Sequence, residues 1–261
     1  MTAYKTLLYE KKGHVAYITL NRPERMNAFN HDSHVELPAV WQAFGQDPDA
    51  WVAVITGAGD RAFSTGIDVK DVAGGSLHMP RGLFDEPKLT AKENLGWKPV
   101  ICALNGLICG GALRFVANAD IVIAAPHVEI FDTHVMVGIP AALEQIPMAR
   151  KMPLGESLKM AVVGRTERMS VQRAYEIGLV QEIVPKERLM ARATELADMI
   201  CENAPLAVQG SVEALWASLD LPLKEALDYG FKIVQANFLT EDFKEGPRAF
   251  AEKRKPQWKG R

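Results

Sequence analysis

The sequence predicts an α/β fold with a helical C-terminal region, and three observations support this prediction. Short runs rich in Val, Ile and Ala occur at residues 51–56, 99–104 and 120–125, and each is bounded by Gly, Pro or Asn, which is typical of buried strands. Turns and stretches compatible with helices separate these runs. From residue 154 onward the pattern of apolar residues becomes helical. Strands that alternate with helices, followed by helices alone, favour the α/β class.

The first elements are a hairpin and a helix. Residues 7–10 and 14–20 alternate apolar and polar side chains on either side of a Lys-Gly pair, as two antiparallel strands joined by a turn do. Asp32 or Ser33 is expected to cap the helix that follows, because both side chains can accept a hydrogen bond from a free backbone N–H. Gly45 is expected to end that helix before the strand at residues 51–56.

The later elements follow from the same patterns. A further short strand is expected at residues 128–131. Gly178 is expected to lie just beyond the end of a helix, where glycine is common. Helices are expected at residues 88–97, 112–117, 154–163, 170–177, 186–201, 205–216, 222–236 and 242–253.

Composition and charge narrow the class of protein. The chain has 261 residues, a formal net charge of −2 and 48% hydrophobic residues, so no basic field for nucleic acid is indicated. No run approaches eighteen apolar residues and the first residues lack the apolar centre of a signal peptide, so no membrane partner or secretion is expected. Cys102, Cys109 and Cys201 form no C-x-x-C pair, which favours free thiols and a cytoplasmic location.

Two glycine motifs are the candidate functional features. Gly110 and Gly111 follow the strand at residues 99–104 and an Asn-Gly turn, at the point where a helix is expected to begin. The first N–H groups of a helix have no internal partner, and glycine lets a ligand approach them closely. Taken alone, this pattern fits a tight strand–helix turn without a ligand equally well. The second motif, Ser64-Thr65-Gly66-Ile67-Asp68, follows the strand at residues 51–56.

Together these motifs resemble the enoyl-CoA hydratase/isomerase (crotonase) superfamily. The resemblance extends from residue 7 to residue 258 and includes N-R-P-x-x-x-N-A-F at residues 21–29 and E-G-x-x-A-F-x-E-K-R-x-P at residues 245–256. It implies a crotonase-like ββα spiral core at residues 1–190, and a helical C-terminal oligomerisation region at residues 191–261 that forms trimers or hexamers.

The resemblance also implies an activity and a set of contacts. The N–H groups of Ile67 and Gly111 would form an oxyanion hole for the enolate of an acyl-CoA thioester, each contributing roughly 3 kcal/mol to lowering the barrier. Coenzyme A would enter as part of the substrate, and no other cofactor or metal is expected. Four further residues would contact the CoA portion, two of them across a subunit boundary: Arg25, Ala28, Phe250 and Lys253.

Some of these positions have simpler interpretations. Arg25 is also consistent with a solvated loop arginine, and Asp68 either contacts the substrate or caps the helix after it. Residues 72–98 correspond to the variable region that shapes the acyl pocket in family members. His78 and Arg81 lie within it, as substrate contacts or as loop residues.

The chain departs from the hydratases at both acid positions. The two glutamates that add water to the double bond would fall at Arg114 and His134. Arginine cannot act as a base, whereas histidine has an unperturbed pKa near 6.5. His134 is therefore either a base or a buried imidazole hydrogen-bonded to Asp132. Arg114 either pairs with a nearby acid or binds a second carboxylate on the substrate.

Glu144 is the remaining candidate acid, although an acid in the first turn of a helix has the same pattern. The sequence thus predicts an acyl-CoA enzyme of the enoyl-CoA hydratase/isomerase type. Two alternatives stay open. One is an acyl-CoA or β-diketone hydrolase or C–C lyase that uses His134 as base, and the other is a non-catalytic acyl-CoA binder.

Overall fold

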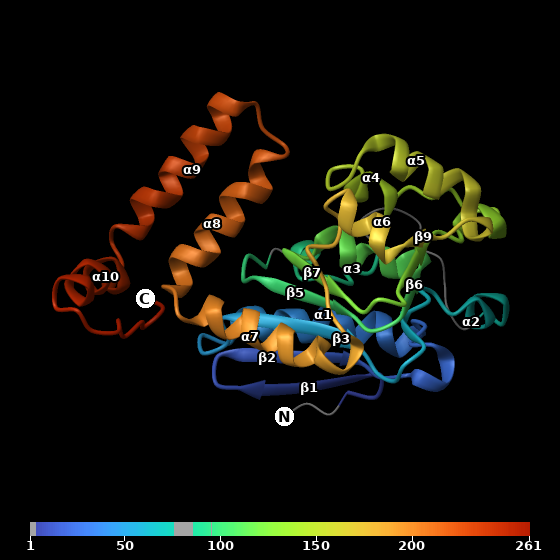
Figure 1. Cartoon of the computed structure of the whole chain (residues 1–261), viewed down its shortest axis with the longest axis horizontal. Helices are drawn as coiled ribbons and strands as arrows, with labels where there is room; N and C mark the ends of the chain where they lie inside the picture. The colour runs from blue at the N-terminus through green and yellow to red at the C-terminus, as the bar shows by residue number, and fades with distance from the viewer. Residues whose placement is uncertain (1–3, 76–85, 95) are drawn as a thin grey trace.

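The computed structural model describes residues 4–75, 86–94 and 96–261, and its core is a six-stranded sheet (Figure 1). The first two strands pair antiparallel, as the hairpin prediction requires, and the other described pairings in this sheet are parallel. Parallel strands covered on both faces are apolar throughout, and this explains the continuous runs of the sequence. In order across the sheet the strands are β1 (Leu7–Lys12), β2 (Val15–Leu20), β3 (Val52–Gly57), β5 (Val100–Leu104), β7 (Ile121–Ala124) and β10 (Glu182–Ile183).

A second, smaller sheet lies beside the first. Its four strands are β4 (Ala62–Ser64), β6 (Leu107–Cys109), β8 (Glu129–Phe131) and β9 (Met169–Ser170), in that spatial order. Each of β3, β5 and β7 in the first sheet is followed by the next strand in the second sheet, so the chain passes between the sheets in successive turns. The α/β fold with a repeated β-β unit and a helical C-terminal region is confirmed.

The helices largely follow the sequence pattern. Gly178, at φ +79°, lies just beyond the end of α6. The helices are α1 (His31–Gln46), α2 (Val69–Ala73), α3 (Leu113–Asn118), α4 (Gln145–Met148), α5 (Leu154–Val163), α6 (Val171–Glu176), α7 (Leu189–Cys201), α8 (Pro205–Ser218), α9 (Leu223–Asn237) and α10 (Glu241–Ala251).

Two local predictions are wrong. Asn30, not Asp32 or Ser33, caps α1, because its side chain accepts from the N–H of Ser33 while the Ser33 hydroxyl reaches back to the Asn30 N–H, forming a capping box. The described residues between 88 and 97 form a short 3₁₀ turn, Lys92–Asn94, instead of the expected helix. The Asn94 amide donates to the carbonyls of residues 88 and 90, so local side-chain bonds replace helical ones.

The boundary expected at residue 190 falls inside packed structure. Helix α7 buries Leu189, Ala193 and Ala197 in the main core, so it belongs with the sheets. The part that projects from the core begins at α8 and includes α9 and α10 (Figure 1). The Trp216 indole joins this arm to the core by donating to Asp120 at 2.7 Å, and Lys92 pairs with the same carboxylate at 3.1 Å.

Within the described ranges, none of the helices has the length and apolar character that crossing a membrane requires.

The buried centre of the main sheet should dominate the stability of the core. Leu104 at the end of β5 is fully buried, so Leu104→Ala should lower the free energy of unfolding by about 2–5 kcal/mol. Leu8 is 53% exposed on the edge strand β1, and Leu8→Ala should change it by about 0.5 kcal/mol or less. Denaturant unfolding at one fixed protein concentration measures both. Equal losses would place the stabilising core elsewhere.

Candidate active site

The site forms where three neighbouring parallel strands end. β4 pairs with β6 and β6 pairs with β8, all parallel, so their carboxyl ends meet at one edge of the smaller sheet. Gly66-Ile67 follows the first strand, Gly110-Gly111 the second and Asp132-Thr133-His134 the third. The topology therefore brings together successive segments that lie 44 and 22 residues apart in the sequence, counted from Gly66 to Gly110 and from Gly110 to Asp132.

The two glycine motifs approach so closely that no side chain fits between them. Gly66 has φ +76°, and a Cβ at this position would lie 2.6 Å from the backbone nitrogen of Gly111. Both the left-handed conformation and the missing side chain are therefore needed here. Among the described residues, the N–H groups of Ile67 and Gly111 donate to no protein acceptor. A Cβ on Gly111 would lie 3.9 Å from both the Ile67 nitrogen and Glu144 Oε1, so all three groups border one small space.

A pocket of about 340 Å³ opens at this point. Its lining is mainly apolar, and its polar side chains among the described residues are Thr65, Thr133 and His134. Such a pocket suits an apolar group held next to a few polar ones. The lining residues are Thr65, Ile67, Val69, Val72, Ala73, Gly110, Gly111, Thr133, His134, Val137 and Ile139.

His134 lies between two acids. Its Nδ1 is 2.7 Å from Asp132 Oδ1, and its Nε2 is 3.7 Å from Glu144 Oε2. Asp132 is fully buried and Glu144 is only 5% exposed. Gln145 Nε2 donates to the second oxygen of Asp132 at 2.9 Å. The sequence predicts that His134 is either a base or a buried imidazole hydrogen-bonded to Asp132. The hydrogen bond to Asp132 is present, and the other ring nitrogen, Nε2, faces Glu144.

The charges of this group are coupled. Burial favours the neutral imidazole of His134, but the hydrogen bond to Asp132 and the negative charges of Glu144 and Asp132 outweigh it and raise its pKa. Burial also raises the pKa of Glu144, and His134 only partly offsets this. Burial opposes the charge of Asp132, yet hydrogen bonds from His134 and Gln145 hold its pKa below the usual range. The His134–Glu144 pair therefore tends to share a proton, and Asp132 stays ionised.

Arg114 does not line this pocket and is not available for a substrate carboxylate. Its guanidinium, 7% exposed, lies 2.6 Å from Glu86 and 2.6 Å from Glu93, and it also donates to the carbonyl of Pro87. Of the two interpretations of Arg114, the structure favours the pairing with nearby acids. It fastens residues 86–94 onto α3.

The other predicted contact residues lie in different settings. The Asp68 carboxylate accepts from the Lys70 N–H at the start of α2 and lies 3.4 Å from Arg22, so it acts as a helix cap. Ala28 is buried and its carbonyl accepts from Arg22, while Arg25 is exposed. His78 and Arg81 fall outside the described residues.

Phe250 and Lys253 lie far from the three strand ends within one chain. Phe250 lies in the last turn of α10 and Lys253 lies two residues beyond its end, and α10 is on the opposite side of the molecule from α2 (Figure 1). Phe250 is 88% exposed, which is unusual for a large aromatic side chain.

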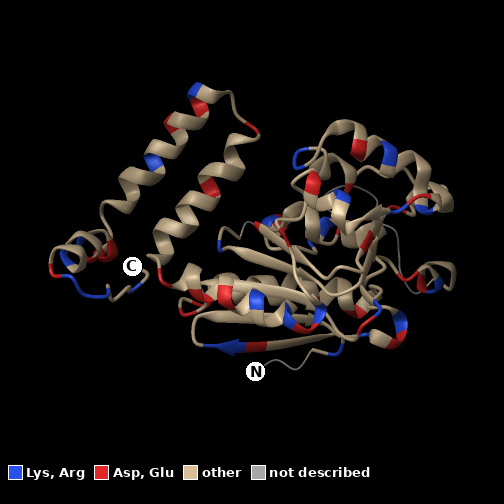
Figure 2. Cartoon of the chain, in the orientation of Figure 1, with Lys and Arg blue, Asp and Glu red and all other residues tan. Residues whose placement is uncertain are grey.

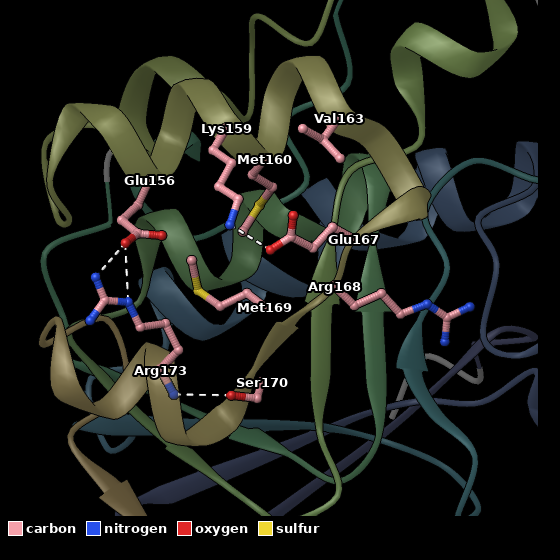
Figure 3. Close-up of a pocket in the computed structure, with 9 residues that line it drawn as sticks. All are labelled: Glu156, Lys159, Met160, Val163, Glu167, Arg168, Met169, Ser170 and Arg173. Atoms are coloured by element: carbon pink, nitrogen blue, oxygen red, sulfur yellow. Dashed lines mark hydrogen bonds and ion pairs between the residues drawn. The ribbon is translucent and has the colours of Figure 1, made fainter.

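A second pocket, of about 400 Å³, lies between α5 and the β9–α6 segment. Figure 3 shows two ion pairs among its charged side chains, Arg173 with Glu156 and Lys159 with Glu167, while Arg168 points away from them. No residue expected at the active site lines this pocket. In the described part of the chain, no three His, Cys, Asp or Glu side chains are grouped to hold a metal ion.

Comparisons with known proteins agree with this geometry. Residues 10–261 match the family model described as enoyl-CoA hydratase/isomerase. The chain is 35% identical to (E)-benzylidenesuccinyl-CoA hydratase of Thauera aromatica over 252 residues, which cover 96% of this chain and 98% of the relative. It is also 35% identical to carnitinyl-CoA dehydratase of Proteus mirabilis over 260 residues, with coverages of 96% and 97%.

Solved structures give the same result. The chain superposes on a crystal structure of an enoyl-CoA hydratase/isomerase from Mycobacterium paratuberculosis with a TM-score of 0.91 and 41% identity, covering all of both chains. An enoyl-CoA hydratase from Bacillus anthracis superposes with a TM-score of 0.89 and 30% identity, covering 98% of this chain and 100% of that one.

The buried ion-pair cluster gives a stability prediction. Arg114→Met keeps most of the volume but leaves the carboxylates of Glu86 and Glu93 without their partner, so the free energy of unfolding should fall by about 3–5 kcal/mol. The control is Arg150→Met, which removes an exposed pair with Asp220 and should cost about 1 kcal/mol or less. Thermal unfolding compares the two. Similar losses would mean that the Arg114 cluster has no special structural role.

Proposed function

Because the chain belongs to the enoyl-CoA hydratase/isomerase family, and is an acyl-CoA enzyme of that type, we propose how its own residues carry the reaction. The thioester carbonyl of the substrate is held by the N–H groups of Ile67 and Gly111. His134 and Glu144 then move the protons. The observation that carries this proposal is the convergence of two free N–H groups and a buried carboxyl group on one small space.

The two N–H groups act on charge that develops during the reaction. Addition to, or proton loss from, the acyl chain places negative charge on the thioester oxygen as an enolate. Fixed backbone donors in a site of low polarity stabilise that charge without reorganisation, and each contributes roughly 3 kcal/mol. The donors of Ile67 and Gly111 belong to backbone that the Gly66 contact holds in place.

The proton-transfer steps balance with one base and one acid. In hydration, His134 Nε2 takes a proton from water as its oxygen bonds to Cβ, the double-bond electrons move to form the enolate, and Glu144 gives its proton to Cα. Dehydration is the reverse. In isomerisation, one member of the pair removes a proton from one carbon and returns it at another. Burial raises the pKa of Glu144, which favours the protonated form that can donate.

A second reaction has an observation in its favour. The His134–Asp132 pair, with Nδ1 held at 2.7 Å, resembles the arrangement that makes an imidazole an efficient base. The same base would support hydrolysis or C–C cleavage of an acyl-CoA or β-diketone. Product mass separates hydrated, isomerised and cleaved products, and the absence of turnover on all acyl-CoA esters would leave a non-catalytic binder.

The remaining assignments also belong to the proposal. Coenzyme A, as part of the substrate, would contact Arg25 and the backbone of Ala28, and Phe250 and Lys253 of a neighbouring copy. Arg25, Phe250 and Lys253 are exposed, which supports contacts outside the single chain. The free thiols Cys102, Cys109 and Cys201 support a cytoplasmic location.

The arm formed by α8–α10 supports assembly into trimers or hexamers. An apolar groove runs between α8 and α9, lined by Leu215, Leu227 and Phe231 among others, and these three side chains are 57–70% exposed. Figure 2 shows little charge along α8, and the charged residues of α9 are not among those that line the groove. An exposed apolar surface of this kind is typical of an interface, and we propose that a second copy covers it.

The first test addresses the oxyanion hole. Gly66→Ala places a Cβ 2.6 Å from the Gly111 nitrogen and should lower kcat for an acyl-CoA substrate by about 10²–10³. Gly75→Ala is the matched control, because φ is +72° there but nothing lies within 4 Å of the added Cβ, and its kcat should change little. Steady-state turnover on a panel of acyl-CoA esters measures both. A folded Gly66→Ala variant with wild-type kcat would contradict the role of the two N–H groups.

The second test addresses the acid and the base. His134→Gln and Glu144→Gln should each lower kcat by about 10²–10⁴, because each removes one titratable group. Wild-type hydration of crotonyl-CoA should be slower than that of a two-glutamate hydratase by a similar factor. Loss of the enoyl thioester absorbance, with product mass as a check, measures the rates. Fast hydration that neither substitution affects would show that the chemistry lies on other residues.

The third test addresses assembly. Sedimentation at micromolar concentration should show a species of at least three chains. Leu227→Asp and Phe231→Asp should shift it to smaller species by burying charge at the contact. The control Lys224→Ala changes an exposed charge on the same helix and should leave the size unchanged. A wild-type monomer of 28.8 kDa would refute both the assembly and the shared CoA site.

A further inference from the structure

We infer that Asp132, Gln145 and Ser157 form a buried hydrogen-bond chain that positions His134, fixing its proton on Nδ1 and directing Nε2 toward Glu144 and the pocket. The inference rests on the proposed function, since it gives His134 its role as base. These three residues act through His134, so they are positioning residues. None of them lines the pocket.

The chain starts at Ser157 on α5. Its hydroxyl lies 2.9 Å from Gln145 Oε1 and 3.1 Å from the Gln145 backbone carbonyl, and it donates to this pair of oxygens. With Oε1 facing the hydroxyl, the Gln145 amide nitrogen faces Asp132 and donates to its Oδ2 at 2.9 Å. The opposite amide orientation would place Oε1 against a carboxylate oxygen, which is unfavourable. All three side chains are at most 5% exposed, so water does not compete for these bonds.

Asp132 transmits this orientation to His134. Its Oδ1 accepts from the His134 backbone N–H at 2.8 Å and lies 2.7 Å from the ring Nδ1. An ionised carboxylate can only accept hydrogen bonds, so Nδ1 must carry a proton. In the neutral imidazole, the lone pair is then on Nε2, the nitrogen that faces Glu144 at 3.7 Å.

Two neighbouring residues act on the two nitrogens of the His134 ring. Glu144 and Gln145 are adjacent in the sequence, yet they lie on opposite sides of this ring. Glu144 faces Nε2 directly, and Gln145 acts on Nδ1 through Asp132. The ring is thereby held by residues from the segment just after β8, from α4 and from α5. Loss of the bond at Gln145 would free the Asp132 carboxylate to turn and the imidazole to change tautomer.

Four charged groups act on the protonation of His134, and Asp132 contributes most directly through its hydrogen bond. Glu144 and Glu86 also favour the imidazolium, while Arg114 acts on the pair by lowering the pKa of Glu144. Removing the Asp132 charge must therefore lower the pKa of His134. Because the base is active when Nε2 is unprotonated, the acidic limb of kcat/KM should then move to lower pH.

The experiment combines NMR with pH profiles on the full chain. The ¹⁵N shifts of the His134 imidazole, assigned by comparison with His134→Gln, should show the Nδ1–H tautomer in the wild type at high pH. In Asp132→Asn the His134 pKa should fall by about one unit or more, with a matching shift of the acidic limb and a fall in kcat of about 10²–10⁴. If Asp132 had a merely structural role, its substitution would lower the stability but would change neither the His134 pKa measured by NMR nor the acidic limb of the kcat/KM profile.

Ser157→Ala provides a milder test. Loss of one neutral hydrogen bond should lower kcat by about 2- to 10-fold and broaden the His134 signals. Its control is Ser170→Ala, which removes the cap of α6 but no member of the chain, and should leave the His134 tautomer and the pH profile unchanged. Equal effects of the two substitutions on kcat would count against a role for Ser157.

Two results would overturn the inference: an Nε2–H tautomer in the wild type, or an unchanged His134 titration in Asp132→Asn. If Asp132→Asn does not fold, the wild-type spectrum and the Gln145→Leu variant test the inference instead. An unchanged His134 tautomer and titration in Gln145→Leu would also refute the role of the hydrogen-bond chain. The spectra require no turnover. An Nδ1–H tautomer in a protein inactive on every acyl-CoA ester would support the positioning and refute the proposed function.

Discussion

The close approach of the backbone at Gly66 to the backbone at Gly111 is the constraint on which the site depends. A distance of 2.6 Å from a Cβ position to a nitrogen leaves room for hydrogen only. The parallel pairing of β4 and β6 fixes this approach, because it aligns the ends of the two strands. Any side chain at residue 66 would separate the two free N–H groups. The smaller sheet thus fixes the backbone N–H groups of Ile67 and Gly111 next to each other.

The protein contains two clusters of buried charged side chains, one around Arg114 and one around His134. The cluster around Arg114 neutralises Glu86 and Glu93 and fastens a neighbouring segment to α3. The cluster around His134 keeps one ionised acid, Asp132, and one acid of raised pKa, Glu144, on either side of an imidazole. The Arg114 guanidinium is 7% exposed and bonded to two carboxylates and a carbonyl, whereas the imidazole keeps one nitrogen directed at the pocket. Two buried clusters of charge thus differ in whether a polar atom is left facing a pocket.

The C-terminal arm differs from the core in how much apolar surface it leaves exposed. Its helices α8 and α9 pack on each other but leave large apolar side chains such as Leu215 and Phe231 exposed. In the described chain, the bond from Trp216 to Asp120 and the ion pair of Arg150 with Asp220 are among the contacts that tie the arm to the core. A surface of this composition gains stability when it is covered.

The sequence by itself determined the hairpin, the three other long strands of the main sheet, β8, nearly all of the helices and the two glycine motifs. These depend on local patterns: continuous apolar runs for strands buried on both faces, helical periodicity, and glycine where no Cβ fits. The sequence did not show the short strands β4, β6, β9 and β10. It failed at residues 88–97, where side-chain bonds from Asn94 replace helical ones, and at the cap of α1, where a reciprocal pair decides the first residue.

Only the tertiary structure decided what the candidate polar residues contact. Whether Arg114 meets an acid or a ligand depends on Glu86 and Glu93, whose approach no local pattern reveals. The sequence could place His134 near Asp132, two residues away, but not between Asp132 and Glu144. Gln145 and Ser157 gave no sign of a role, because a glutamine and a serine acquire one only when the fold buries them against a carboxylate. Local pattern fixes backbone elements, while the partner of a buried charge is set by packing between elements distant in the chain.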